Sequence, residues 1–314
     1  MDIGLLPAKP KEVDVLCVGH ASYDLVFSVP HHPDSDEKML ADAFIGCGGG
    51  PAANAAVLVS KLGLSSAFAG YLGSDLYGDK HLQELVDYNV IVNCVVRGSV
   101  PTPLSTVLVK PDGKRALINY KGDTKQLPEA AVNFVPIKPK VILLDGHEPM
   151  ISVPLAKAAK AQGIPTILDA GSVHDGTLAL MELVDYLVCS EKFAQQYAGD
   201  VKKALSVMAG LSANVVITLG EKGLIWQRGN QQGSLPAYVV SVVDTTGAGD
   251  AFHGAFAAAL ALDMDWLDSL RYASAAGALC CGKAGARLGL PTKQAHWDLF
   301  KTGLDDLKPA EYLS

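Results

Sequence analysis

Short runs of apolar, often β-branched residues alternate along this chain with longer segments of helical character. Several of the short runs are continuously apolar, which is typical of strands covered on both faces. This alternation predicts an α/β fold, in which helices flank a mainly parallel sheet. The predicted strands are 13–18, 66–71, 141–145, 165–169, 186–189 and 215–219. The predicted helices are 52–62, 75–87, 151–162, 175–183, 191–209, 249–262 and 267–281.

Two stretches interrupt this alternation. Residues 20–46 carry no strong helical period, and residues 91–121 contain three short strand-like runs. The last two of these runs are joined by K-P-D-G-K, where Asp112-Gly113 is a strong hairpin signal. Both stretches therefore look like insertions that form a small β-sheet beside one main domain spanning 1–314. Residues 222–240 are expected to form another hairpin.

Composition narrows the classes of partner. The chain of 314 residues has a formal charge of −7, which argues against a nucleic-acid binder because such proteins cluster Lys and Arg. No uncharged apolar run reaches the roughly 18–20 residues of a membrane span. The start, M-D-I-G-L-L-P-A-K-P-K-E, lacks the basic region and sustained apolar core of a secretory signal.

Cysteine usage agrees with a cytoplasmic location. The six cysteines form no C-x-x-C pair, and most of them lie in apolar runs, so we expect buried, reduced thiols rather than disulfides or a zinc site. They are Cys17, Cys47, Cys94, Cys189, Cys280 and Cys281.

The first motif with chemical content is D-T-T-G-A-G-D-A-F-H-G-A, residues 244–255. A helix is predicted to begin within its Gly-Ala-Gly segment. The first N–H groups of a helix lack internal partners and carry partial positive charge, so this terminus suits a phosphate. Taken alone, a G-x-G-D sequence is also explained by a tight turn with Asp250 in the first helical turn; the flanking Asp244, Thr245 and Thr246 make the pattern more specific.

The second motif is C-G-G-G-P-A-A-N-A-A-V-L-V-S-K-L-G, residues 47–63. Gly49 and Gly50 precede a helix and can expose backbone N–H groups to a polar ligand. Asn54 offers both a donor and an acceptor, as hydroxyl-rich ligands need. A plain glycine turn with a solvated Asn54 explains the same residues. The chain contains neither a full G-x-G-x-x-G dinucleotide fingerprint nor a G-x-x-x-x-G-K-[ST] loop, which argues against a nicotinamide-dependent oxidoreductase.

In their order and separation, the two motifs resemble the signatures of the ribokinase-like (PfkB) family of carbohydrate and nucleoside kinases, and the resemblance covers nearly the whole chain. It implies a three-layer α/β/α sandwich with a mainly parallel central sheet and a small β-sheet lid over the sugar. The lid would be formed by about 20–46 and 91–121. Members of this family are commonly homodimers joined through the lid.

The resemblance also implies an activity: transfer of the γ-phosphoryl group of ATP, with Mg²⁺, to a hydroxyl of a small-molecule sugar. Asp250 matches the base that takes the proton of the acceptor hydroxyl. The backbone N–H groups of Gly247, Ala248 and Gly249 match the anion hole for the transferring phosphoryl group. Positioning and stabilisation of spread negative charge are what phosphoryl transfer needs.

Further roles follow from the resemblance alone. Asp24, in H-A-S-Y-D, matches an aspartate that binds sugar hydroxyls, and Gly49, Gly50 and Asn54 would line the same pocket. The segment 275–286 should approach the adenine. The residues implied to bind the nucleotide are Thr218, Gly220, Gly223, Ala278 and Gly285.

Two metal sites are implied. Many members carry N-x-x-E, whose glutamate orders Mg²⁺ through water, but this chain has Ser190 and Phe193 at the two ends of that motif. Glu191 is then the candidate for the magnesium role, although a glutamate at a helix start is also explained by a salt bridge. Asp244 and Thr246 match positions that often hold a monovalent cation such as K⁺.

Within the family the chain looks most like the branch of 6-deoxy-6-sulfofructose kinase, which binds the sulfonate through a lysine, an asparagine and an arginine. Lys38 and Asn119 match the first two positions, whereas His147 stands at the arginine position. Loss of the bidentate arginine weakens the prediction of an anionic acceptor, and Glu148 is a candidate for binding hydroxyls. The expected acceptor is a ketose or related sugar; an adenosine-like nucleoside, or a non-catalytic sugar-binding regulator, are the alternatives.

Overall fold

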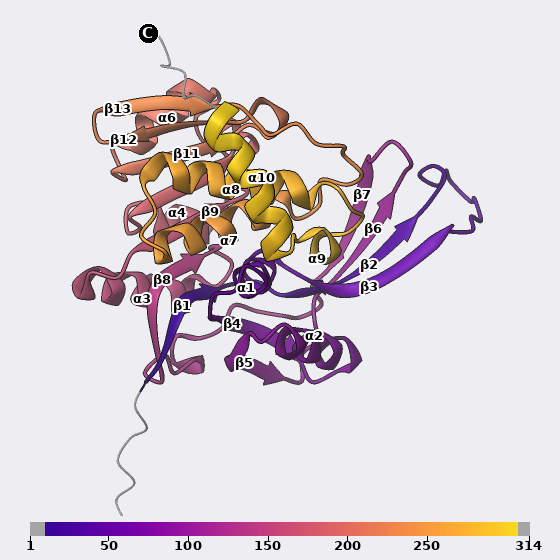
Figure 1. Ribbon diagram of the computed structural model, residues 1–314. Coiled ribbons are helices and arrows are strands. Elements are labelled where there is room, and N and C mark those ends of the chain that lie inside the picture. The colour runs from indigo at the N-terminus through magenta and orange to yellow at the C-terminus, as the bar shows by residue number, and fades with distance from the viewer. Residues whose placement is uncertain (1–9, 307–314) are drawn as a thin grey trace, which may run out of the picture.

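A computed structural model describes residues 10–306 of the chain, and a nine-stranded sheet forms its centre (Figure 1). The strand order is β13-β12-β11-β10-β9-β8-β1-β4-β5, with parallel pairing from β11 to β5 and an antiparallel hairpin, β12–β13, at one edge. The predicted α/β fold is confirmed, as is the hairpin within 222–240. The strands are β1 Lys11–Val18, β4 Ser66–Gly73, β5 Ile91–Gly98, β8 Ile137–Leu144, β9 Thr166–Ala170, β10 Tyr186–Ser190, β11 Asn214–Thr218, β12 Leu224–Arg228 and β13 Gln231–Leu235.

Helices cover both faces of this sheet, so each central strand is buried on both sides. In β1, Val15 and Cys17 pack into one core cluster, together with α1, α7 and α8, while Leu16 and Val18 pack into the other, together with α3, α5 and α6. This is why the sequence of the strand is continuously apolar. The helices are α1 Pro51–Lys61, α2 Leu76–Asp87, α3 Pro149–Gln162, α4 Asp175–Leu180, α5 Glu191–Ala198, α6 Val201–Ala209, α7 Ala248–Ala261, α8 Trp266–Cys280, α9 Ala286–Gly289 and α10 Lys293–Asp306, with short 3₁₀ turns η1 Glu129–Ala131 and η2 Gly220–Lys222.

The single helix predicted over 191–209 is two helices. Gly199 ends α5 in a left-handed conformation, with φ of 77°. Asp200 then caps α6, because its side chain accepts a hydrogen bond from the backbone N–H of Lys203. A glycine followed by an aspartate supplies a helix stop and a helix start in two residues.

A second sheet of four strands projects from one side of the main domain (Figure 1) and is called the lid below. Its order is β3-β2-β6-β7, with β2 and β6 parallel and the two outer pairs antiparallel. The hairpin predicted at Asp112-Gly113 joins β6 to β7, and Gly113 has a φ of 76°. The lid strands are β2 Ser22–Ser28, β3 Ala43–Gly49, β6 Leu104–Val109 and β7 Arg115–Tyr120.

The predicted lid boundary at residue 91 is wrong, because the first of the three strand-like runs, β5, lies at the edge of the main sheet beside β4. The chain passes from β4 through α2 to β5, which is a βαβ unit, and such a crossover favours a parallel partner in the same sheet. Strand pattern alone did not separate this edge strand from the lid strands that follow it.

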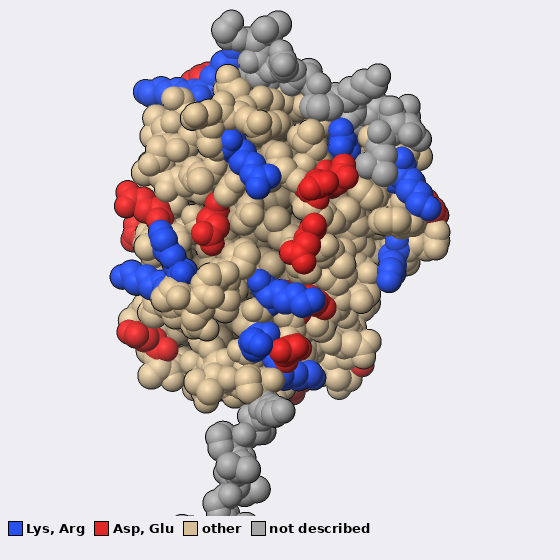
Figure 2. Space-filling view, turned by 60° about the vertical axis from the view of Figure 1, so that its left-hand side comes forward, with Lys and Arg blue, Asp and Glu red and all other residues tan. Residues whose placement is uncertain are grey.

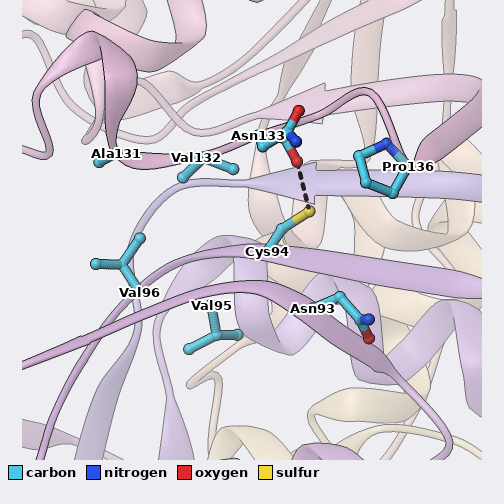
Figure 3. Close-up of a pocket in the computed structure, with 8 residues that line it drawn as sticks. All are labelled: Asn93, Cys94, Val95, Val96, Ala131, Val132, Asn133 and Pro136. Atoms are coloured by element: carbon cyan, nitrogen blue, oxygen red, sulfur yellow. Dashed lines mark hydrogen bonds between the residues drawn. The ribbon is translucent and has the colours of Figure 1, made fainter. Parts of the chain in front are cut away.

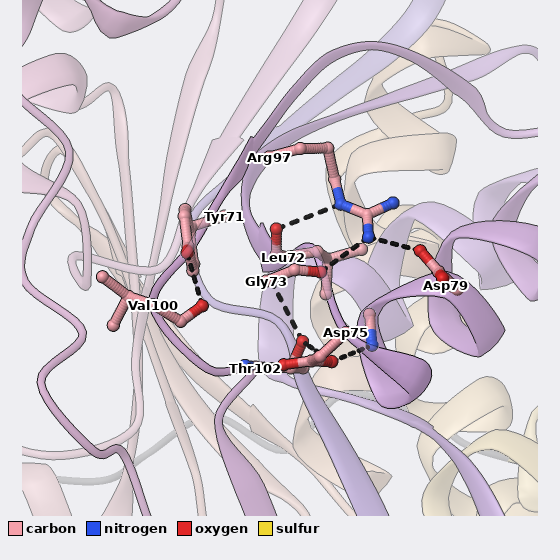
Figure 4. Close-up of polar contacts among 9 residues, drawn as sticks. Tyr71, Leu72, Gly73, Asp75, Asp79, Arg97, Val100 and Thr102 are labelled. Carbon is pink, nitrogen blue, oxygen red and sulfur yellow. Dashed lines mark hydrogen bonds and ion pairs between the residues drawn. The ribbon is translucent and has the colours of Figure 1, made fainter.

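A cluster of polar contacts fixes the segment that leads from β5 into the lid (Figure 4). Asp75 caps α2 by accepting a hydrogen bond from Gly78, and it also accepts hydrogen bonds from the backbone and side chain of Thr102. Arg97, at the end of β5, donates to the carbonyl groups of Leu72 and Gly73. The base of the lid is therefore tied to the end of the main sheet by hydrogen bonds to backbone atoms.

The surface and the chain ends add two observations. One face of the molecule carries interspersed acidic and basic side chains (Figure 2). Over residues 10–306, no helix is long and apolar enough to cross a membrane. The N-terminal segment used above to argue against a secretory signal lies almost wholly outside the described residues.

Candidate active site

The glycine-rich motif forms the start of α7, as predicted. Gly247 is its N-cap residue, with a left-handed φ of 78°, and a Cβ atom there would lie 2.5 Å from the Cβ of Ala286. Ala251 donates the first backbone hydrogen bond of the helix, to the Gly247 carbonyl at 2.8 Å. A Cβ added at Gly249 would meet no atom within 4 Å, so the space beside this helix start is open.

Asp250, in the first turn of α7, is bound to the second sequence motif. Its Oδ2 accepts a hydrogen bond of 2.7 Å from Nδ2 of Asn54 in α1. The two helices approach closely because a Cβ at Gly254 would lie 2.9 Å from the Ala55 carbonyl oxygen. Burial raises the pKa of Asp250, while the hydrogen bond from Asn54 and the nearby His253 act in the opposite direction.

Asp24 lies on the face of the lid that is turned toward Asp250. In the register of the four strands, Cys47, Asp24, Ser105 and Asn119 form one row, so their side chains project from the same face. Burial raises the pKa of Asp24 to about 6, and Asp250 adds to this through charge repulsion. Hydrogen bonding from Ser22 and Ser105 and the charge of Arg287 counteract the increase.

Gly49 and Gly50 connect the lid to α1 beside Asp24. A Cβ at Gly49 would lie 2.3 Å from the Asp24 carboxylate, and one at Gly50 would lie 2.5 Å from the His20 carbonyl oxygen. Gly50 also has a φ of 95°, which side-chain-bearing residues rarely adopt. Gly49 is therefore required by close packing against the carboxylate, and Gly50 by its positive φ and by the nearby His20 backbone.

His147 and Glu148 lie at the start of α3, where Glu148 is the N-cap residue. Glu148 is buried, and its Oε2 accepts a hydrogen bond of 2.6 Å from the Leu127 backbone, so this oxygen supports the fold. Its pKa is raised to about 7, chiefly by burial. The ring of His147 stacks on that of His174 at 4.8 Å and lies 5.2 Å from that of His20.

Lys38 is exposed in the connection between β2 and β3. No hydrogen bond or ion pair joins it to the other predicted site residues within 10–306. Of the three residues matched to a sulfonate site, Asn119 therefore lies on the same lid face as Asp24, two strands away, whereas Lys38 makes no hydrogen bond or ion pair with the other two.

The residues assigned to the nucleotide lie at the carboxyl ends of neighbouring strands. Thr218 ends β11 and is paired in register with Ser190 at the end of β10. Gly220 and Gly223 have φ values of 60° and 90°, and a Cβ at Gly223 would lie 2.0 Å from a backbone oxygen. Glu191 follows Ser190 at the start of α5 and lies 3.5 Å from the amine of Lys222.

Two nucleotide-side residues come from the α8–α9 region. Ala278 lies on α8, one residue after Gly277, where a Cβ would lie 3.1 Å from the Ala248 carbonyl oxygen. Gly285 donates a backbone hydrogen bond of 2.8 Å to Asp244. The segment 275–286 thus packs directly against the start of α7. Its approach to the adenine stays a prediction.

Asp244 does not have the surroundings of a cation ligand. One of its oxygens accepts hydrogen bonds from the backbone and hydroxyl of Thr246, and the other accepts from Gly285. The guanidinium of Arg115, from lid strand β7, donates to the Thr246 hydroxyl and lies 3.7 Å from Asp244. A fixed positive charge beside an occupied carboxylate repels a second cation, so these residues do not fit the monovalent-cation site implied by the resemblance.

Sequence reasoning missed several polar residues here. Asp145 and Asp169 each close an apolar run, V-I-L-L-D and T-I-L-D, and an acid at the carboxyl end of a parallel strand is a signal that was available. Asp145 accepts hydrogen bonds from the backbone of His20 at 2.7 Å and of His147 at 2.9 Å. Asp169 lies 3.3 Å from His253, and burial raises its pKa to about 7.

A cavity of about 260 Å³, which none of the predicted site residues lines, lies between β5 and residues 131–136 (Figure 3). It is on the edge strand of the main sheet, and Cys94, which it contains, has a pKa raised by burial. Thiol chemistry is thus disfavoured there. In the part of the chain that is described, no group of His, Cys, Asp or Glu side chains is arranged to hold a metal ion on its own.

The fold and this site define a class of protein, namely an α/β enzyme of ribokinase-like architecture with a β-sheet lid. Residues 13–293 match the pfkB family carbohydrate kinase pattern. Fructokinase-2 of Zea mays is 30% identical over 301 residues, covering 85% of this chain and 90% of that protein. The chain belongs to the pfkB family of carbohydrate kinases, which are phosphotransferases with an alcohol group as acceptor, so the predicted family and enzyme class are confirmed.

Solved structures of ribokinases share the fold of this chain. A putative ribokinase from Agrobacterium tumefaciens superposes with a TM-score of 0.85 at 27% identity, covering 94% of this chain and 99% of that one. Arabidopsis thaliana ribokinase, in a complex with ribose and ATP, gives a TM-score of 0.80 at 27% identity, covering 93% and 99%. The resemblance to the sulfofructose kinase branch stays a prediction.

Proposed function

We propose that this protein transfers the γ-phosphoryl group of ATP to a hydroxyl of a sugar, with Asp250 as the base. The observation that carries the proposal is the placement of Asp250 in the first turn of α7, held by Asn54 and facing Asp24 on the lid. The raised pKa of Asp250 makes its carboxylate a better proton acceptor near neutral pH than an exposed aspartate.

The start of α7 supplies the second part of the chemistry. We propose that the backbone N–H groups of Gly247, Ala248 and Gly249 bind the transferring phosphoryl group, although the Ala248 N–H also makes a long hydrogen bond of 3.3 Å to the Thr245 carbonyl. The open space beside Gly249 supports close approach of that group. Donors that are already oriented stabilise such charge without a reorganisation cost at the moment of reaction.

We propose a sugar, a ketose or a related compound, as the acceptor. Asp24 accepts hydrogen bonds from its hydroxyl groups, and Ser105 and Asn119 on the same lid face add further polar contacts. Both fructokinase and ribokinase relatives support a small polyhydroxylated acceptor. Because one carboxylate oxygen of Glu148 already accepts a hydrogen bond from the Leu127 backbone, we propose Asp24 as the main carboxylate of the sugar site.

ATP would bind along the carboxyl ends of β10 and β11, between Thr218, Gly220 and Gly223 on one side and Ala278 and Gly285 on the other. Glu191 fits a magnesium role, because its side chain is 34% exposed and its ion pair with Lys222 is long. It would hold the hydrated ion through water. When bound, Mg²⁺ neutralises charge on the nucleotide phosphates.

The test is Asp250→Asn, which removes the proton acceptor but keeps the shape and the contact with Asn54. We expect kcat to fall by roughly 10²–10⁴-fold, with ATP binding unchanged by calorimetry. Activity is measured as ADP release over D-fructose, D-ribose, sugar phosphates, sulfofructose and adenosine. Asp298→Asn, on exposed α10, is the matched control. Near-normal turnover in Asp250→Asn would refute the role of Asp250; no phosphorylation of any acceptor by the wild type would refute the kinase function.

We also propose that the lid mediates a homodimer. Its outer face carries Phe44, Ile118 and Tyr120, each more than half exposed, and the rings of Phe27 and Phe44 pack at 4.9 Å. These side chains alternate with the inward row that contains Asp24. An exposed apolar sheet face of this kind favours association with a second copy.

A further inference from the structure

Arg287, in α9, is completely buried, although no sequence signal assigned it a role. Burial of an arginine is costly unless its guanidinium is paired and hydrogen bonded. The Nε atom donates to Oδ1 of Asn54 at 3.1 Å. On the other side, Nη2 lies 3.2 Å from His81 Nε2, and Nη1 lies 3.6 Å from Glu84.

The contact with Asn54 decides how that amide is oriented. Its Oδ1 accepts from Arg287 while its Nδ2 donates to Asp250 at 2.7 Å. A flipped amide would place its NH₂ group against the guanidinium, donor against donor, and its oxygen against the carboxylate. Arg287 therefore selects the one orientation in which Asn54 donates to Asp250.

The far side of the guanidinium is fixed by two elements. Burial and the charge of Arg287 hold the pKa of His81 well below its usual value, so the ring stays neutral and offers a lone pair. Glu84, on the same helix α2, accepts a hydrogen bond of 2.6 Å from the backbone of Gly48. A Cβ at Gly48 would lie 2.5 Å from His81 and 2.9 Å from Arg287 Nη2. The guanidinium is thus packed against Gly48, near the end of lid strand β3. This strand lies beside α9 (Figure 1).

The same charge acts on the lid carboxylate. Asp24 faces three titratable or charged groups from the elements around it, namely Arg287, Asp250 and Cys47. Of these, only Arg287 is positive, and it lowers the pKa of Asp24 against the effect of burial. The geometry agrees, because a Cβ at Gly48 would lie 2.9 Å from Arg287 Nη2 and a Cβ at the next residue, Gly49, would lie 2.3 Å from the Asp24 carboxylate, so both groups pack against the same end of β3.

We propose that Arg287 is a positioning residue for the reaction: it orients Asn54, and through it Asp250, and it supplies a positive charge beside the Asp24 carboxylate. The proposal rests on the kinase function proposed above. If Arg287 only stabilised the fold, its substitution would lower the free energy of unfolding without changing the pH dependence of sugar binding.

The experiment compares Arg287→Gln and Arg287→Lys in the full chain, with D-fructose and D-ribose as acceptors. The glutamine variant loses the charge, so the acidic limb of kcat/KM and of sugar affinity by calorimetry moves to higher pH. The lysine variant keeps the charge but not the planar fork, so that limb stays in place. In both variants we expect kcat to fall roughly ten- to hundredfold, because the base is misplaced.

A double-mutant cycle tests the route through Asn54. If Arg287 acts on kcat through this amide, Arg287→Lys adds little to the loss caused by Asn54→Ala. Arg97→Gln, at the end of β5, controls for loss of a hydrogen-bonded guanidinium outside this network, because Arg97 donates to the carbonyl groups of Leu72 and Gly73. If Arg287→Gln does not fold, the proposal is tested with Arg287→Lys and the double-mutant cycle instead.

The proposal is overturned by a folded Arg287→Gln with unchanged kcat and an unchanged acidic limb, or by fully additive losses in the cycle. These outcomes are distinct from failure of the kinase function, because that function is judged first by turnover of the wild-type protein.

Discussion

At the scale of single residues, the main feature of the candidate site is a set of carboxylates that are largely shielded from water. Asp24, Asp169 and Asp250 all have a pKa raised by burial, and each is balanced by a nearby donor or cation. Asp24 has the clearest consequence for stability. A carboxylate whose pKa rises from 3.8 to about 6 is less stable in its ionised form by roughly 3 kcal/mol.

The sign follows from linkage. The folded protein binds the Asp24 proton more tightly than the unfolded chain does, so stability is lost as the pH rises from about 4 to about 6. We expect Asp24→Asn, which carries no charge, to gain about 1–2 kcal/mol of unfolding free energy at pH 8 and much less at pH 4.

The same substitution removes the proposed hydroxyl acceptor, so sugar affinity should fall. Thermal unfolding at the two pH values and calorimetry with D-fructose and D-ribose check both halves. A lower Tm for Asp24→Asn at pH 8 would show that the ionised side chain stabilises the fold.

At the scale of elements, the start of α7 depends on a backbone conformation that only glycine adopts easily. Gly247 has positive φ, and its missing Cβ leaves room for Ala286 at the start of α9. Gly163, which ends α3, has a similar φ of 69° but open space around it. Comparing substitutions at these two glycines therefore separates the cost of backbone strain from the cost of a steric clash.

We expect Gly163→Ala to lower the free energy of unfolding by about 1 kcal/mol, from strain alone. Gly247→Ala should lower it further and reduce turnover, because α7 and α9 must move apart. Chemical denaturation and ADP-release assays measure the two effects. Equal destabilisation of the two variants with full activity in Gly247→Ala would contradict this account.

At the scale of the whole molecule, the two faces of the lid differ in the side chains that they present. The inward row contains Asp24, Ser105 and Asn119, and the outer face exposes Phe44 and Ile118. Because side chains alternate along a strand, one strand such as β7 supplies both faces. The outer face is the surface we assign to a second copy of the chain.

Light scattering after size-exclusion chromatography should give twice the chain mass of 32.9 kDa. Ile118→Lys places a charge on the proposed interface and should yield the monomer. Val207→Lys alters a similarly exposed apolar residue on α6 and should leave the dimer intact. A monomeric wild-type protein would exclude this role of the lid.

The sequence by itself determined the central strands and the helix start at the first turn of α7. Apolar runs predicted the central strands, because a strand that is buried on both faces consists almost entirely of apolar residues. The glycines and Asp250 were recognisable because helix-terminus chemistry is local. The placement of β5 was missed because an edge strand and a lid strand have the same period, and only the βαβ crossover distinguishes them.

Only the tertiary structure decided which distant residues meet. Asn54 and Asp250 are bound to each other because α1 packs on α7, and Arg287 reaches Asn54 because α9 inserts between α1, α2 and the lid. Likewise, Arg115 of lid strand β7 contacts Asp244 and Thr246 only because the lid packs beside the loop that precedes α7. Such contacts join residues separated by more than 100 positions, and no local pattern encodes them.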